Sequence, residues 1–356
     1  MAEAALKPRE AVVRMAPYSP PTAGREGKLR LDFNENTVGC SPAVVQSLAS
    51  AVTQERLTIY PEYEATRAAL SQFFAVPQQQ FLLTNGTDEA IQVLVNTFVD
   101  DEQQVIVLHP SYAMYRFYAE VAGARVINLP YRPGDLSFPL DELLARITPM
   151  TRAILIANPN NPTGTGIGID AIEAILQRAP QAAVLIDEAY YEFCGVTALP
   201  LIASYGNLLV SRTFSKAYGL AGLRIGCLFS QAANVQYLHK VQSPYSVNIL
   251  AAIAARVAVA DTAYVDQFVQ QALKARDLLY AGFEQRGIAH YKSQGNFVLF
   301  RAGEKSIAIR DALRARGVLV RDRSYEIAGC VRVTAGTPTQ VERFFAELDD
   351  VLGAEA

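Results

Sequence analysis

Short apolar runs alternate with longer amphipathic runs through residues 46–245 of this 356-residue chain. Runs rich in β-branched and aliphatic residues predict short buried strands. They are FLLT, QVIVLHP, RVINLP, RAILIAN, AAVLIDE and NLLVSRTF. The segments between them, such as DEAIQVLVNTFV and GIDAIEAILQRA, repeat apolar residues at helical spacing. Strands that alternate with helices need crossover connections, so the pattern predicts a large α/β domain with a doubly wound, mostly parallel sheet.

The pattern changes after residue 245. Long helical runs come first, and the short strands NFVLF, VLVRD and CVRVTAG follow around one further helical run, SIAIRDALRARG. This order predicts a smaller α+β domain over residues 246–356. Residues 1–45 are rich in proline, glycine and charge. We expect them to form an arm that packs with the small domain, and residues 46–245 to form the large domain.

Composition excludes several classes of protein. A hydrophobic content of 51% supports a sizeable core, and a net charge of −3 does not favour nucleic acid or an anionic membrane as a partner. The four cysteines lie far apart and the three histidines have no ligand spacing, so we expect neither a disulfide framework nor a metal site. No apolar run reaches the length of a membrane span, and the N-terminal residues lack a signal-peptide pattern. We therefore expect a cytoplasmic protein.

Polar residues follow the predicted strands at their carboxyl ends, where doubly wound sheets bind ligands. Asn85, Gly86 and Thr87 stand between a strand and a helix, as an anion site or an ordinary helix cap. Asp187 ends another strand, where a buried carboxylate needs a partner. That partner can be a structural cation, Mg²⁺, a ribose hydroxyl or a protonated ring nitrogen. Glu188 faces the opposite side of the same extended chain, so we do not pair it with Asp187.

A lone lysine, Lys216, stands in the stretch RTFSKAYGLAGLRIG. It is either a surface charge beside a glycine-rich turn or an amine kept for chemistry, because an apolar setting lowers the pKa of an amine. Thr213, Ser215 and Arg224 around it suit a phosphate group. An amine for an aldehyde, hydroxyls with an arginine for a phosphate, and an acid at a strand end for a ring nitrogen together indicate pyridoxal 5'-phosphate as cofactor. The glycines at 219, 222 and 226 are expected to let backbone pack closely behind them.

A nicotinamide cofactor is an alternative from a different class. The run NPNNPTGTGIG, with Asp187 on the next strand, loosely imitates a dinucleotide-binding unit. Its glycines run GxGxG instead of GxGxxG, and PNNP separates them from the strand, so this oxidoreductase hypothesis is the weaker one. A binding protein without catalysis has no need of the amine at Lys216.

The motifs together resemble a known family. The series YPEY, NGTDEAI, NPNNPTG, DEAYYEF and RTFSKAYGLAGLRIG resembles the fold type I pyridoxal-phosphate aminotransferases over nearly the whole chain. The further segments APY, LDFNEN, PSYAMY, GVLVRD and GCVRVTAGT are most similar to the histidinol-phosphate aminotransferase family, although Thr37 stands where that family commonly has proline. The resemblance implies amino transfer between L-histidinol phosphate and 2-oxoglutarate by a ping-pong mechanism, in histidine biosynthesis. Phenylalanine or tyrosine as amino donor is the alternative, and decarboxylation of threonine phosphate is a third.

The resemblance also implies roles for individual residues. Lys216 bonds to the cofactor aldehyde and moves a proton on the substrate, Asp187 pairs with the ring nitrogen, and Tyr190 hydrogen-bonds the phenolate oxygen. The other cofactor-binding residues are Asn161 at that oxygen, Tyr112 on the ring face, and Gly86, Thr87, Thr213, Ser215 and Arg224 at the phosphate. Tyr60 reaches the phosphate from a neighbouring subunit, which implies a homodimer.

Four residues are implied to bind substrate: Arg332 and Arg321 hold its anionic group, Tyr18 completes that pocket, and Asn36 approaches it. On the residues alone, Arg332 would be interpreted as a solvated strand residue. Any of Tyr60, Tyr112 and Tyr190 could then be a residue of core or interface packing.

Overall fold

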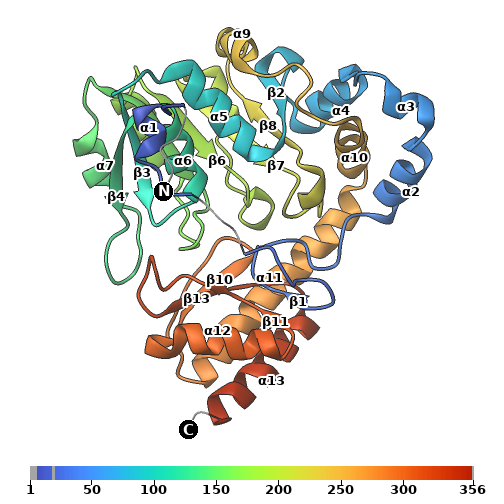
Figure 1. Ribbon diagram of the computed structural model, residues 1–356, viewed down its shortest axis with the longest axis vertical. Coiled ribbons are helices and arrows are strands. Elements are labelled where there is room, and N and C mark those ends of the chain that lie inside the picture. The colour runs from blue at the N-terminus through green and yellow to red at the C-terminus, as the bar shows by residue number, and fades with distance from the viewer. Residues whose placement is uncertain (1–5, 18–20, 355–356) are drawn as a thin grey trace.

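The two main sheets lie in the upper and lower parts of the molecule in Figure 1, and a third sheet has only two strands. The computed structural model describes residues 6–17 and 21–354. Its large sheet has seven strands and its small sheet has four, each with helices packed against it. This architecture confirms the predicted α/β fold with a large, mostly parallel sheet and a smaller α+β part.

The large sheet has the strand order β2-β8-β7-β6-β5-β3-β4. In that order the strands are Phe81–Thr84, Gly226–Phe229, Leu208–Thr213, Ala183–Asp187, Thr151–Ala157, Gln104–His109 and Arg125–Pro130. Strand β8 runs antiparallel to both of its neighbours, and the other pairings are parallel. Parallel strands end at the same edge, so the residues after β2, β3, β5, β6 and β7 meet there.

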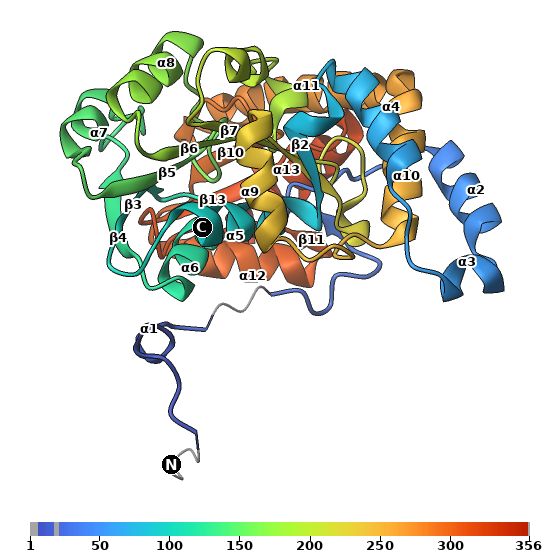
Figure 2. The same ribbon diagram turned by 90° about the horizontal axis from the view of Figure 1, so that it is seen from above.

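Helices cover both faces of the large sheet because alternate strand residues point to opposite sides. Leu155 packs with α5 (Gly86–Phe98), α6 (Ala113–Val121) and α9 (Ala232–Val241), whereas its neighbour Ile154 packs with helices of the other face. Figure 2 shows this sheet between α6 and α8. The helices of the other face are α2 (Pro42–Ala51), α4 (Glu64–Phe74), α7 (Leu140–Arg146), α8 (Ile169–Arg178) and α10 (Ile249–Ala260).

The small sheet is antiparallel, with the order β12-β13-β10-β9. In that order the strands are Arg321–Asp322, Cys330–Thr334, Phe297–Arg301 and His290–Tyr291. Helices α11 (Thr262–Gln285), α12 (Ser306–Ala315) and α13 (Pro338–Ala354) pack around it on a core that includes Phe283, Phe300 and Phe344. The remaining elements are α1 (Glu10–Val13), α3 (Gln54–Thr58) and the 3-10 turns Gln78–Gln80, Tyr191–Phe193, Leu199–Ala203, Ala221–Leu223 and Gly303–Lys305.

The arm forms a separate two-stranded sheet and is joined to the small sheet by a hydrogen bond from Thr334 N–H to the Leu31 carbonyl. Strand β1 (Leu29–Arg30) pairs in parallel with β11 (Val318–Leu319), and Leu31 is buried in the small core. By contrast, α10 packs against α2 and α4 beside the large sheet. The division of the chain at residues 45 and 245 stays a prediction. Within residues 6–17 and 21–354, no helix is both long enough and apolar enough to cross a membrane.

Candidate active site

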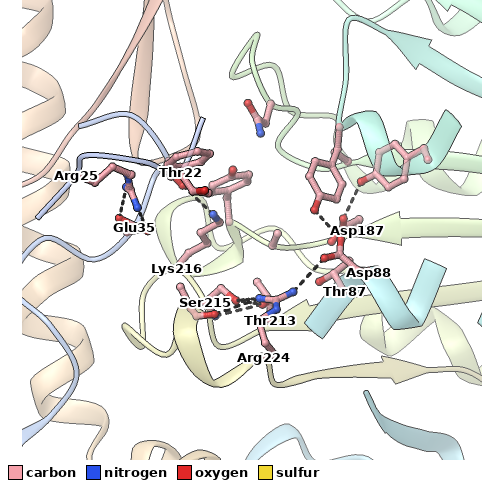
Figure 3. A pocket seen from close by; sticks show the side chains of 18 residues that line it. Thr22, Arg25, Glu35, Thr87, Asp88, Asp187, Thr213, Ser215, Lys216 and Arg224 are labelled. Carbon is pink, nitrogen blue, oxygen red and sulfur yellow. Dashed lines mark hydrogen bonds and ion pairs between the residues drawn. The ribbon is translucent and has the colours of Figure 1, made fainter. Parts of the chain in front are cut away.

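A cavity of about 260 Å³ opens at the carboxyl edge of the large sheet. Side chains from five strand ends, from the arm and from the Lys216 loop line it (Figure 3). Nine residues that the sequence singles out are among them. They are Thr87, Tyr112, Asn161, Asp187, Tyr190, Thr213, Ser215, Lys216 and Arg224.

The amine of Lys216 points from the loop after β7 towards the arm. Its Nζ donates a hydrogen bond of 2.9 Å to the backbone carbonyl of Phe33. Burial, with a smaller contribution from the positive charge of Arg332, lowers the pKa of Lys216 to about 8. A sizeable fraction of this amine is therefore neutral near pH 8, and a neutral amine can attack a carbonyl. Lys216 is thus not an ordinary surface charge.

Asp187 lies at the end of β6 and is buried. Its carboxylate accepts hydrogen bonds of 2.7 Å from the Tyr115 hydroxyl and 2.9 Å from the Ser211 hydroxyl. Burial raises the pKa of Asp187 to about 6 even though both hydroxyls stabilise the charge. No lysine or arginine in the described part of the chain forms an ion pair with it, so a cation of a ligand would find this carboxylate available. The sequence reasoning missed Tyr115, although it stands one helical turn after Tyr112.

Three elements build the cup for an anion. Gly86 begins α5 with a φ of +72°, and a Cβ there would lie 2.3 Å from Nη2 of Arg224. The Arg224 guanidinium lies 3.3 Å from the Ser215 hydroxyl and 3.1 Å from the Asp88 carboxylate. Thr87 Oγ1 is buried without a partner among the described residues. A helix N-terminus, a guanidinium and available hydroxyls are groups that bind phosphate.

The wall facing the small sheet carries Tyr190 and Asn161. The Tyr190 hydroxyl accepts a hydrogen bond of 3.0 Å from the side-chain amide of Asn34, and Oδ1 of Asn161 accepts one from Arg332. The Tyr112 hydroxyl donates a hydrogen bond of 2.6 Å to the Asp88 carboxylate. These contacts fix the polar ends of all three predicted cofactor ligands at the cavity.

Arg332 and Arg321 lie opposite each other in the small sheet, next to this wall. Arg332 is only 3% exposed, and it also donates to the backbone carbonyl of Asp32. Its Nε has no partner among the described residues, and burial, with the charge of Arg323, lowers the pKa of Arg332 to about 10. A buried guanidinium needs an anion. The interpretation of Arg332 as a solvated strand residue is therefore wrong.

Among the predicted residues that the structure describes, five are not part of the cavity lining: Asn36, Tyr60, Gly86, Arg321 and Arg332. The Asn36 amide donates to the carbonyl of Ala217 at 2.9 Å, so this side chain ties the arm to the Lys216 loop. Tyr60 is 74% exposed and stacks on Tyr245 with 4.4 Å between ring centroids. Tyr18 lies outside the described residues.

The arm supplies cavity residues that the sequence reasoning did not place there: Thr22, Arg25, Phe33 and Glu35. Arg25 donates to the Asp32 carboxylate at 2.8 Å and to the Glu35 carboxylate at 2.7 Å. The FNEN segment is the sequence signal for Phe33 and Glu35, and the sequence reasoning gave none for Thr22 and Arg25.

Glu188 and its surroundings agree with the expectation that it is not a second catalytic acid. It pairs with the buried Arg212 at 2.7 Å, on the side of β6 away from the cavity. This pair holds the ends of β6 and β7 together, and Tyr191 covers the Arg212 guanidinium at 3.4 Å from the ring centroid.

The glycine-rich stretches serve packing. A Cβ on Gly164 or Gly166 would collide with Ser293 or Gln294, so that loop is closed by the small part instead of opening on a nucleotide. A Cβ on Gly226 would lie 2.7 Å from the carbonyl oxygen of Arg212, and Gly219 is similarly crowded by backbone, as expected. The same expectation is wrong for Gly222, which has no atom within 4 Å of such a Cβ.

Comparison with known proteins decides the family. The model of aminotransferase class I and II matches residues 26–348. The chain belongs to this family. Within the class I and II aminotransferases, it is 36% identical to the histidinol-phosphate aminotransferase of Symbiobacterium thermophilum, over 97% of this chain and 98% of that protein. It is 34% identical to the protein of the same name from Moorella thermoacetica, over 97% and 93%.

Solved class I and II aminotransferases share the fold. A crystal structure of histidinol-phosphate aminotransferase from Sinorhizobium meliloti, in complex with pyridoxal-5'-phosphate, superposes with a TM-score of 0.89 at 24% identity. That match covers 99% of each chain. The predicted fold type I architecture is therefore confirmed for this aminotransferase.

Proposed function

We propose that this protein transfers an amino group between L-histidinol phosphate and 2-oxoglutarate, with pyridoxal 5'-phosphate as cofactor, in histidine biosynthesis. The observation that carries the proposal is the position of Lys216. Figure 3 places its amine between the arm residues on one side and Asp187 with the Arg224 cup on the other. The names of the relatives support the substrate, and the family supports the reaction.

The residues present fit the cofactor. Gly86 leaves space for Arg224. Within the described residues, Thr87 Oγ1 has no hydrogen-bond partner and Asp187 has no cation as partner. Gly86, Thr87, Thr213, Ser215 and Arg224 would hold the phosphate. Asp187 would pair with the ring nitrogen, Asn161 and Tyr190 would bind the phenolate oxygen, and Tyr112 would cover the ring. When bound, the cofactor supplies an aldehyde carbon for amines and a ring that accepts the electron pair of a breaking C–H bond.

Lys216 is the proton carrier. With a pKa lowered to about 8, its Nζ can take a proton from the substrate Cα and release it again near neutral pH. Asp187 is mostly ionised above pH 6, so its carboxylate would stabilise the positive charge of a protonated ring nitrogen. Tyr115 and Ser211 keep the Asp187 carboxylate in one orientation through their hydrogen bonds.

Arg332 and Arg321 would take the anionic group of each substrate in turn. Arg332 is buried next to the cavity wall, and its Nε has no partner in the part of the chain that the structure describes. Guanidinium groups bind phosphate and carboxylate by the same pair of parallel hydrogen bonds. One cation site can thus serve L-histidinol phosphate in one half-reaction and 2-oxoglutarate in the other. Asn36 and Tyr18 complete this pocket in the proposal.

Replacement of Lys216 by alanine tests the reaction. The loaded wild-type protein should absorb visible light through its lysine-bound cofactor, and Lys216→Ala should lose that band and both half-reactions while keeping its fold by circular dichroism. Full turnover by Lys216→Ala refutes the proposal. A kcat/KM for L-phenylalanine above that for L-histidinol phosphate would instead assign the aromatic substrate, and saturable NAD(P)H binding without pyridoxal 5'-phosphate would revive the oxidoreductase.

The exposed Tyr60 belongs to a homodimer in this proposal, and the protein is cytoplasmic. Tyr60 and Tyr245 are exposed, and so are four apolar side chains in the segment before Tyr60, all of which a second copy would cover: Val45, Val52, Leu57 and Ile59. Tyr60 would reach the phosphate of the partner's cofactor. Mixed Tyr60→Ala and Lys216→Ala chains should then regain activity, because each mixed dimer rebuilds one intact site. Mixtures no more active than either variant would refute the shared site.

A further inference from the structure

The cavity has two chemically different ends. Asp187, Thr87 and Arg224 lie at the end formed by the large sheet, and Arg25 and Glu35 lie at the arm end, with Lys216 between them (Figure 3). If the cofactor occupies the sheet end, as the proposed function requires, the part of the substrate beyond Lys216 must lie against the arm.

Glu35 is the acidic group at this arm end among the described residues that line the cavity. Arg25 donates hydrogen bonds of 3.1 and 2.7 Å to its two oxygens and is itself held by Asp32 at 3.0 and 2.8 Å. Burial alone would raise the pKa of Glu35, but Arg25, with smaller contributions from Arg30 and Lys216, holds it below its ordinary value. The carboxylate is therefore ionised and fixed in orientation, and its remaining lone pairs can accept further hydrogen bonds.

The arm end offers little to a benzene ring. Phe33 is its aromatic residue among the described ones, and both partners of that ring are cations. Arg25 lies 4.4 Å and Arg321 5.3 Å from the ring centroid. A ring without polar atoms would lie beside the Arg25–Glu35 pair without satisfying it. A ring with N–H groups would find an anionic acceptor there.

We propose that the Glu35 carboxylate accepts a hydrogen bond from the ring N–H of the amino donor and thereby selects imidazole over benzene substrates. This inference rests on the proposed function and makes it more specific. Arg25 fixes the orientation of the acceptor. Arg25 and Arg30 together balance the charges of Glu35 and Asp32, so the anionic 2-oxoglutarate of the other half-reaction meets a group without net charge. Arg25 is thus a positioning residue, and Glu35 is the specificity-determining one.

A matched pair of substrates isolates the ring. L-Histidinol phosphate and L-phenylalaninol phosphate carry the same amine and phosphate and differ only in imidazole against benzene. We expect Glu35→Gln, which keeps the shape but removes the charge, to lower the ratio of their kcat/KM values by about tenfold. The change in charge near Lys216 affects both compounds equally and cancels in the ratio. Glu35→Asp, which withdraws the carboxylate by one methylene, should lower the ratio in the same direction.

The control is Asp32→Asn. It weakens the other hydrogen bonds of Arg25 without changing a side chain that lines the cavity, so it should change both kcat/KM values by the same factor. The rise in Tm that each phosphate produces in the full chain is the second measurement. We expect Glu35→Gln to reduce this rise for L-histidinol phosphate only.

Three results overturn the inference. An unchanged ratio in Glu35→Gln while the wild type converts L-histidinol phosphate refutes the role of Glu35 alone. An equal fall of the ratio in Asp32→Asn shows that Glu35 only orders the arm. A wild type that converts neither phosphate contradicts the proposed function, and the inference falls with it.

Discussion

The position of Gly86 predicts that a single added methyl group, in Gly86→Ala, weakens cofactor binding. Its φ of +72° is strained for any residue with a Cβ, and the methyl of Gly86→Ala would lie 2.3 Å from Nη2 of Arg224. The backbone strain should lower the free energy of unfolding by about 1–2 kcal/mol. The displaced guanidinium loses its contacts to Ser215 and Asp88 and moves away from the phosphate cup.

The loss of affinity follows from the contact that is removed. A hydrogen bond to a charged group is worth roughly 1.5–3 kcal/mol, which corresponds to a roughly ten- to hundredfold rise in the Kd for pyridoxal 5'-phosphate. Titration of the cofactor-free protein, followed by visible absorption, measures this Kd. Gly222→Ala is the matched control, because a Cβ there has no atom within 4 Å and its φ is not positive. An unchanged Kd in Gly86→Ala, or an equal rise in Gly222→Ala, would refute this account of the cup.

The remaining predictions concern buried charges. Glu188→Gln leaves Arg212 buried without its close partner and should lower the urea unfolding free energy by about 3 kcal/mol, whereas Asp349→Asn at the surface should cost less than about 1 kcal/mol. Equal losses would contradict the role of burial. In cofactor-free protein, the pKa of Lys216 lies below its unfolded value, so the folded state binds fewer protons and stability should rise between about pH 8 and 10.5. Lys216→Met should remove this rise and stabilise the protein by at most about 3 kcal/mol below pH 8. Tyr115→Phe removes a donor from the β6 carboxylate and should move the acid limb of the kcat/KM profile up by about one pH unit.

The large sheet could be predicted because its strands are buried on both faces and appear as uninterrupted apolar runs. Strand β8 escaped prediction. Its four residues, Gly226–Phe229, stand at the end of the glycine-rich stretch. No local sequence pattern predicts an antiparallel strand between β2 and β7. Helix α3 was not predicted either, because its short polar run, Gln54–Thr58, has no apolar stripe.

The site residues that stand at or just after the end of a predicted strand could be predicted from the sequence. Asp187, Thr213 and Lys216 stand beside strands in the sequence, so the topology alone brings them together. Tyr115 and Glu35 depend on how a helix and the arm fold back over the sheet, which no local pattern encodes. The Asp88 carboxylate beside Arg224 also follows from packing alone.

The hydrogen bond between Lys216 and the Phe33 carbonyl has a mechanical consequence. Phe33 lies in the arm, and the residues on either side of it are bonded to the small sheet: the Leu31 carbonyl accepts from Thr334 N–H, and the backbone N–H of Asn34 donates to the Thr334 hydroxyl. The amine therefore cross-links the two sheets as long as it is not bonded to a carbonyl carbon. Occupation of the amine removes this link. Attachment of the cofactor to Lys216 would therefore remove a hydrogen bond between the large-sheet and small-sheet parts, in the same step that prepares the protein for the reaction.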